Sequence, residues 1–79
     1  MKQIYKNKTT TFKETVTGVV TIDAETPKAF LIDHVEFDDP IWVPKSQVQS
    51  VHKQDPLAPE ATIVMSKWIT EAKGIDDVF

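Results

Sequence analysis

The chain has 79 residues, no cysteine and a formal net charge of −3, with 41% hydrophobic and 27% charged residues. These values are typical of one small globular domain, and they exclude a disulfide framework, a zinc–thiolate site and a disordered chain. All nine basic residues are lysines, so the chain has no guanidinium group for bidentate reading of guanine or phosphate. We therefore expect a single domain over residues 1–79 and disfavour nucleic-acid binding.

The charge is unevenly distributed along the chain. Four lysines and no acidic residue lie in residues 1–13, a segment of charge +4, whereas the remaining residues carry a net charge of −7. We expect residues 1–9 to form a flexible basic arm and residues 76–79 to form a tail. No apolar run of 18 residues is present, and no apolar signal segment follows the first lysines, so we expect a cytoplasmic protein.

Residues 10–22 are rich in valine and threonine and alternate in character. Phe12, Val16, Val20 and Ile22 share one parity, and threonines occupy much of the other, which predicts a long strand with one buried face. Gly18 lies on the inner parity, where a glycine often marks a bulge or bend. We therefore expect this strand to curve.

Four further strands are expected, separated by turns that contain proline and aspartate. They cover residues 28–34, 41–43, 48–52 and 61–65, with a tight turn at 44–47. Ser66 is a suitable N-cap for a helix over residues 67–73, and Gly74 fits the left-handed position that ends a helix. The order predicts a mostly β fold with one short C-terminal helix. We expect a small five-stranded barrel or a strongly bent antiparallel sheet, of the OB or SH3-like kind.

The sequence offers little catalytic chemistry. No serine lies in a G-x-S-x-G elbow, and we interpret His34 and His52 as partly exposed residues rather than general bases. The acid-rich stretch over residues 33–39 does not match a calcium loop and is interpreted as a charged turn. Two glycines cannot form a glycine-rich phosphate loop. We therefore expect no enzyme activity, no metal and no cofactor.

Two short segments carry a candidate ligand site. The turn after Trp42 offers an ammonium, a hydroxyl and an amide beside an indole that could stack on a base, and the predicted helix start offers amide N–H groups that favour an anion. The candidate ligand-binding residues are Trp42, Lys45, Ser46, Gln47, Ser66, Lys67 and Trp68. The alternative is that Trp42 belongs to the core and the turn is merely polar.

The octapeptide from Ile41 to Val48, together with Trp68-Ile69 and Lys73-Gly74-Ile75, resembles small accessory proteins encoded by tailed bacteriophages and prophages. In those proteins a W-[IV]-P-K-S-Q core follows a lysine-apolar strand, here residues 28–31, and the resemblance covers roughly residues 17–75. It implies a non-enzymatic protein of the bacterial host cytoplasm that antagonises a host defence or serves phage DNA replication. It supplies no catalytic residue.

Three functions follow as hypotheses. The first is a binding protein, expected as a homo-oligomer, that sequesters a small nucleotide-type signal molecule. The second is an acidic inhibitor that binds a host defence protein by mimicking nucleic acid. The third is an accessory protein that binds single-stranded nucleic acid during replication. We favour the first, because the chain combines a candidate nucleotide-contact set with a lack of catalytic groups.

Overall fold

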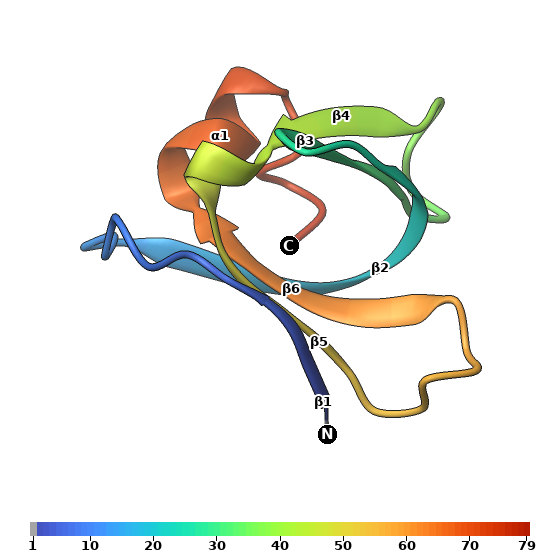
Figure 1. Ribbon diagram of the computed structural model, residues 1–79. Helices are drawn as coiled ribbons and strands as arrows, with labels where there is room; N and C mark the ends of the chain where they lie inside the picture. The colour runs from blue at the N-terminus through green and yellow to red at the C-terminus, as the bar shows by residue number, and fades with distance from the viewer. Residues whose placement is uncertain (1) are drawn as a thin grey trace.

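The computed structural model describes residues 2–79, with side chains from Ile4 onward. Six strands, one 3₁₀ turn and one helix make up this range (Figure 1). In chain order they are β1 (Lys2–Lys6), β2 (Thr15–Glu25), β3 (Ala29–Asp33), β4 (Ile41–Pro44), η1 (Lys45–Gln47), β5 (Val48–Lys53), β6 (Glu60–Ser66) and α1 (Lys67–Ala72). The fold is mostly β with a short C-terminal helix, as the sequence predicts.

All six strands belong to one antiparallel sheet in the order β1-β5-β6-β2-β3-β4. The long strand β2 connects the two halves, because residues 15–21 pair with β6 and residues 21–25 pair with β3. Figure 1 shows β2 curving so that β3 and β4 lie across from β5 and β6. The sheet does not close into a barrel, and the strongly bent sheet is the correct form of the expected fold.

The curvature of the sheet coincides with irregular pairing. Register shifts occur at three places: residues 3–5 of β1, residues 22–24 of β2 and residues 48–50 of β5. Such bulges increase the local twist and bend the strand that contains the extra residue. The bulge expected at Gly18 is absent, since Gly18 pairs regularly with Ile63.

Gly18 serves instead to make room for an aromatic ring. A Cβ atom at this position would lie 2.2 Å from the ring of Phe79, so a larger residue would displace the C-terminal segment. Figure 1 shows the C-terminus within the curve of the sheet. The rings of His34 and Phe37 lie 5.6 and 6.1 Å from that of Phe79, and together they cover one end of the core.

The core lies inside the curve of the sheet. Its largest side chains come from alternate positions of the strands, as expected when one face of each strand is buried. Tyr5 of β1 packs edge-on against Phe30 of β3, with ring centroids 5.4 Å apart, so the two halves of the bent sheet touch directly. Ile69 of α1 and Ile75 after it are 3% and 5% exposed and close the core from the C-terminal side.

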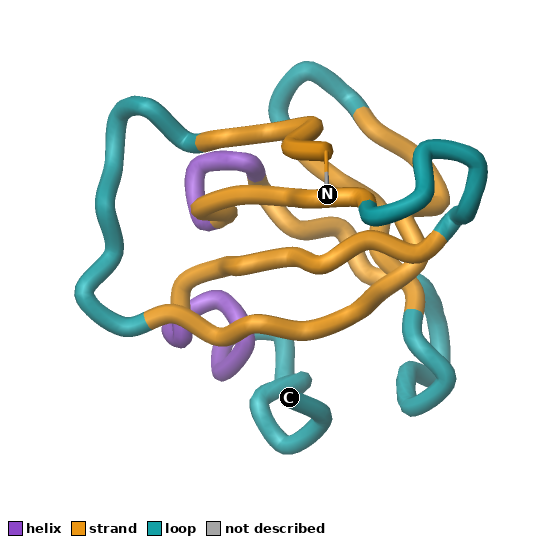
Figure 2. Tube along the Cα trace, turned by 90° about the horizontal axis from the view of Figure 1, so that it is seen from below, coloured by secondary structure: helices purple, strands orange, loops and turns teal. Residues whose placement is uncertain are grey.

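The first strand corrects the sequence prediction. Residues 2–6, expected as part of a flexible arm, form β1 and pair with β5. Conversely, residues 10–14, expected as the start of the long strand, belong to the loop that joins β1 to β2 along one end of the sheet (Figure 2). The reason is that backbone pairing and the inward-facing ring of Tyr5 hold β1, although its sequence alternates only weakly.

Strand β4 forms one edge of the sheet and is poorly suited to pair with another strand. The amide of Lys45 donates to the carbonyl of Lys28, so the backbone groups of Lys45 point toward β3. Along an antiparallel strand the backbone groups of successive residues point alternately toward and away from the neighbouring strand. The backbone groups of Pro44, Trp42 and Pro40 therefore face away from β3. Because proline has no N–H, this edge presents the N–H of Trp42 between two prolines. Short, proline-flanked edges resist strand addition.

Candidate functional site

The structure divides the predicted site residues into two groups. Trp42, Lys45 and Ser46 lie at the junction of β4 and η1, which we call the Lys45 corner. Gln47, Ser66, Lys67 and Trp68 line a common surface depression beside α1, which we call the Trp68 hollow. The two groups come from adjacent parts of the fold but differ in what their side chains contact.

The ammonium of Lys45 is already engaged within the protein. Its side chain is 15% exposed and forms an ion pair with Glu25, the one ion pair among residues 4–79. The same ammonium lies 4.8 Å from the ring centroid of Phe30, a cation–π contact. The carbonyl of Lys45 accepts a hydrogen bond from the Tyr5 hydroxyl at 3.0 Å. Lys45 thus connects β1, β2 and β3 and has little capacity left for a ligand.

A buried asparagine completes the Lys45 corner. Asn7 is 6% exposed, and its Oδ1 accepts from the amides of Thr9 and Thr10 and from the Thr9 hydroxyl at 2.9–3.0 Å. Its Nδ2 donates to the carbonyls of Lys45 and Ser46, both at 3.4 Å. This arrangement fastens the loop after β1 to η1, so the corner is a structural junction.

Trp42 neither belongs to the core nor lines the Trp68 hollow. It is 46% exposed on the outer surface of β4, opposite Leu31 of β3. The alternation of the strand explains this position, since the neighbouring Val43 is fully buried. The indole is accessible, but the lysine and amide that were expected beside it are directed elsewhere.

The Trp68 hollow has a volume of about 540 Å³, within the range of small-molecule sites. Trp68 is 63% exposed and forms part of its wall. The other lining residues are Phe12, Lys13, Glu14, Gln47, Ser66, Lys67 and Glu71. Four of these eight, namely Phe12, Lys13, Glu14 and Glu71, were absent from the sequence prediction.

The register of two strands explains how the missed residues reach the hollow. Thr15 pairs with Ser66, and the amide of Lys67 donates to the carbonyl of Glu14 at 3.1 Å, which extends the ladder by one residue. Lys13 and Glu14 are therefore brought next to the start of α1. Nothing in the linear sequence indicates this pairing, because the two segments are more than 50 residues apart.

The side chain of Gln49 holds residues 10–12, which directly precede Lys13 in the loop between β1 and β2. Its Oε1 accepts from the amide of Phe12 at 3.1 Å, and its Nε2 donates to the carbonyl of Thr10 at 3.3 Å. A side chain that replaces a strand partner in this way satisfies the backbone of the loop. Phe12, which is half-buried, is held against the hollow as a result.

Ser66 is a positioning residue within the hollow. As predicted, it caps α1, and its Oγ accepts from the amide of Ile69 at 3.2 Å. The same hydroxyl donates to Oε1 of Gln47 at 2.7 Å, and Ser66 is only 4% exposed. This hydrogen bond orients the Gln47 side chain. Its Nε2 makes no hydrogen bond to residues 4–79 and is therefore a donor available at the surface.

The start of α1 differs from the expected anion site. The helix has six residues, and the amides of Lys67 and Ile69 donate to Glu14 and Ser66 respectively. Those N–H groups are no longer available to an anion. Positive charge in the hollow comes instead from the side chains of Lys13 and Lys67, both exposed and neither ion-paired within residues 4–79.

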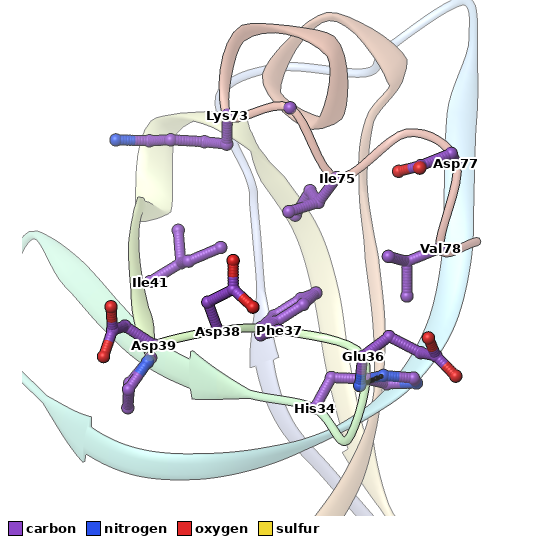
Figure 3. A pocket seen from close by; sticks show the side chains of 12 residues that line it. His34, Glu36, Phe37, Asp38, Asp39, Ile41, Lys73, Ile75, Asp77 and Val78 are labelled. Carbon is purple, nitrogen blue, oxygen red and sulfur yellow. Dashed lines mark hydrogen bonds between the residues drawn. The ribbon is translucent and has the colours of Figure 1, made fainter.

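A second, larger depression lies between the acid-rich stretch and the segment after α1, and we call it the acidic cavity (Figure 3). Its volume is about 790 Å³. Carboxylates of Glu36, Asp38, Asp39 and Asp77 line it together with the ammonium of Lys73. None of the predicted ligand-binding residues lies here.

Local hydrogen bonds support the interpretation of residues 33–39 as a charged turn. Oδ1 of Asp33 accepts from the amide of His34 at 2.8 Å, and Nδ1 of His34 accepts from the amide of Glu36 at 3.0 Å. Within residues 2–79, no three histidine or acidic side chains gather closely enough to hold a metal ion. His52 lies half-buried on β5, away from this turn in the sheet order.

Comparison of the chain with family models, curated proteins and solved structures finds no match in any of the three. No helix within residues 2–79 is both long and apolar enough to cross a membrane. The site is therefore interpreted from its own geometry.

Proposed function

We propose that this protein is a non-enzymatic binding protein and that its ligand is a small nucleotide-type molecule held in the Trp68 hollow. The observation that carries the proposal is the combination of an exposed indole with two unpaired lysines around one depression. An aromatic face stacks on a base, and ammonium groups attract phosphate. Nε2 of Gln47 adds a neutral donor whose direction is set by Ser66.

The side chains of the hollow favour binding over turnover. Its lining includes no histidine, and the only hydroxyl, that of Ser66, is buried and engaged as both donor and acceptor. A nucleophile or general base for hydrolysis must reach the reacting atom and have a free proton or lone pair. The carboxylates of Glu14 and Glu71, which also line the hollow, are the groups left that could act as a base, so recovery of the unchanged ligand is the readout that separates retention from hydrolysis.

The resemblance to phage and prophage accessory proteins supplies the proposed context. A protein that binds a nucleotide-type signal without cleaving it can lower the free concentration of that signal in the host cytoplasm. We include in the proposal that such sequestration antagonises a host defence. We include in the proposal that the protein assembles into a homo-oligomer, and the proline-flanked β4 edge should not take part by strand addition.

The test is titration calorimetry with cyclic mononucleotides, cyclic dinucleotides and cyclic ADP-ribose-type molecules. We expect heat of binding with at least one of them, and recovery of the unchanged ligand by chromatography after long incubation. Trp68→Ala should weaken binding roughly five- to a hundredfold, because stacking of one base contributes about 1–3 kcal/mol. Trp42→Ala is the matched control, since it removes an exposed indole outside the hollow. Absence of heat with every compound would disprove the proposal.

The acidic cavity favours a second candidate function, an inhibitor that binds a basic surface of a host defence protein. Four carboxylates surround this cavity against one ammonium. Affinity for such a partner should fall steeply as ionic strength rises. A pull-down from bacterial lysate at low and high salt distinguishes the two functions, because only the inhibitor should recover a stoichiometric, salt-sensitive protein.

A further inference from the structure

We propose that the Trp68 hollow selects a nucleotide with a single phosphodiester charge over nucleoside polyphosphates and oligonucleotides. This inference rests on the proposed function and specifies the ligand class. It follows from the charged residues around the hollow. The hollow has two walls, the segment before β2 and helix α1, which are far apart in the sequence. The sequence alone therefore did not bring these charges together.

The charges around the hollow are balanced. Lys13 and Lys67 contribute two ammonium groups, and Glu14 and Glu71 contribute two carboxylates. All four residues are exposed, and none forms an ion pair within residues 4–79. A site for a polyanion would instead carry an excess of basic groups.

The two charge types are distributed over both walls. Lys13 and Glu14 are neighbours on the segment before β2, and Lys67 and Glu71 lie one turn apart on the same side of α1. The backbone hydrogen bond between Lys67 and Glu14 fixes the two walls side by side. Each wall therefore presents one ammonium and one carboxylate.

This distribution limits how much negative charge the hollow can accept. The inference assigns one phosphate to Lys13 and Lys67, the lysines of the two walls. A second phosphate on the same ligand would approach Glu14 or Glu71 without a further ammonium to neutralise it, because the hollow is lined by no other basic residue. Like charges brought together in a partly desolvated site oppose binding.

The carboxylates suit the remainder of a nucleotide. Ribose hydroxyls and the exocyclic amines of bases are neutral donors, and carboxylates accept from them. Phe12 and Trp68 provide the aromatic surfaces for the base. The hollow is an open surface depression whose volume of about 540 Å³ matches one nucleotide, whereas an oligonucleotide would extend beyond it onto a chain whose net charge is −3.

The experiment compares ligands that share a base and differ in charge. Adenosine, cyclic AMP, ADP and ATP are titrated into the full chain by calorimetry at one ionic strength, and a guanine series is run in parallel. In the series that binds, we expect the cyclic monophosphate to bind roughly tenfold more tightly than the nucleoside, since charge-assisted hydrogen bonds to phosphate are added. The triphosphate should bind more weakly than the cyclic monophosphate.

Two variants assign the selectivity to the walls. Lys67→Gln should reduce affinity for the cyclic monophosphate roughly tenfold and reduce affinity for the nucleoside much less. Glu71→Gln should raise affinity for the triphosphate severalfold relative to the cyclic monophosphate. Lys28→Gln and Glu60→Gln are the matched controls, because they change the same charges at exposed positions outside the hollow.

The outcomes separate this inference from the function on which it rests. Affinity that increases with each added phosphate, or selectivity that Glu71→Gln leaves unchanged, overturns the single-charge inference while nucleotide binding stands. If neither series binds but a cyclic dinucleotide or a cyclic ADP-ribose-type molecule does, the single-charge inference is overturned while the proposed function stands. Absence of binding by all of these compounds overturns the proposed function and the inference together.

Discussion

The Lys45 corner and the Trp68 hollow contain similar side chains, since each combines an indole, a lysine and a serine. In the corner the lysine is paired with Glu25 and packed on Phe30, and the indole faces away from it. In the hollow Lys67 has no ion partner among residues 4–79, and Trp68 lies in the same wall. The difference shows that residue types near one another in sequence do not define a site; the partners that the fold gives each side chain decide whether it is available.

The comparison predicts that substitutions of the engaged side chains in the corner reduce stability, and the largest effect is expected at Asn7. Asn7→Ala removes the acceptor of three hydrogen bonds at a buried position and leaves two amides without a partner. We expect a loss of about 2 kcal/mol in the free energy of unfolding, measured by urea denaturation.

Gln54→Ala is the matched control for Asn7→Ala. Gln54 is an exposed amide on the loop between β5 and β6, and its removal should change stability by less than about 0.5 kcal/mol. Equal effects of the two substitutions would contradict the structural role assigned to the corner.

A serine in each region sharpens the comparison. Ser66→Ala removes the cap of α1 and the tether of Gln47, and should cost about 1 kcal/mol of unfolding free energy. Ser46→Ala removes an exposed hydroxyl that makes no hydrogen bond within residues 4–79, and should cost almost nothing. Thermal denaturation of both variants measures the two losses. A larger loss of stability for Ser46→Ala than for Ser66→Ala would contradict the predicted order.

For the two lysines the difference is reversed relative to the serines, and the larger loss is expected in the corner. Lys45→Met keeps the stem that packs in the corner but loses the ion pair and the cation–π contact, so we expect a loss of about 1 kcal/mol or less. Lys67→Met should leave stability within about 0.5 kcal/mol of the original. Chemical denaturation at low and high salt measures both, and the Lys45→Met loss should shrink at high salt.

The smallest effect on stability is expected at the residue most important for the proposed ligand. Trp68 is 63% exposed, so Trp68→Ala should change the free energy of unfolding by less than about 0.5 kcal/mol while weakening ligand binding at least about fivefold. A loss of several kcal/mol would show that the indole serves the fold and would weaken the case for the hollow.

The class of fold and most strand positions could be predicted from the sequence because alternation and turn residues are local signals. The capped helix at Ser66 and the left-handed Gly74, with φ of 71°, were confirmed for the same reason. Strand β1 was missed because its position depends on pairing with β5, which no local pattern encodes. The expected curvature of β2 is present, but no bulge lies at Gly18, where the glycine accommodates Phe79 in a contact between distant residues.

The candidate site shows the same division between local and long-range information. Ser66, Lys67 and Trp68 were found because they are consecutive at a recognisable helix start. Lys13 and Glu71 were missed because the hollow forms only when β2 pairs with β6. Lys45 was selected on its residue type, and its contacts with Glu25 and Phe30 depend on the curvature of the whole sheet.

The place of β1 in the sheet has a consequence for the order in which the chain acquires structure. Its partner in the ladder is β5, whose residues 48–53 are synthesised more than 40 residues later. A ribosome therefore exposes the lysine-rich first segment well before its partner strand exists. Such long-range pairings slow folding and make strand docking a late step. The positive charge of that early segment should keep it solvated until β5 emerges.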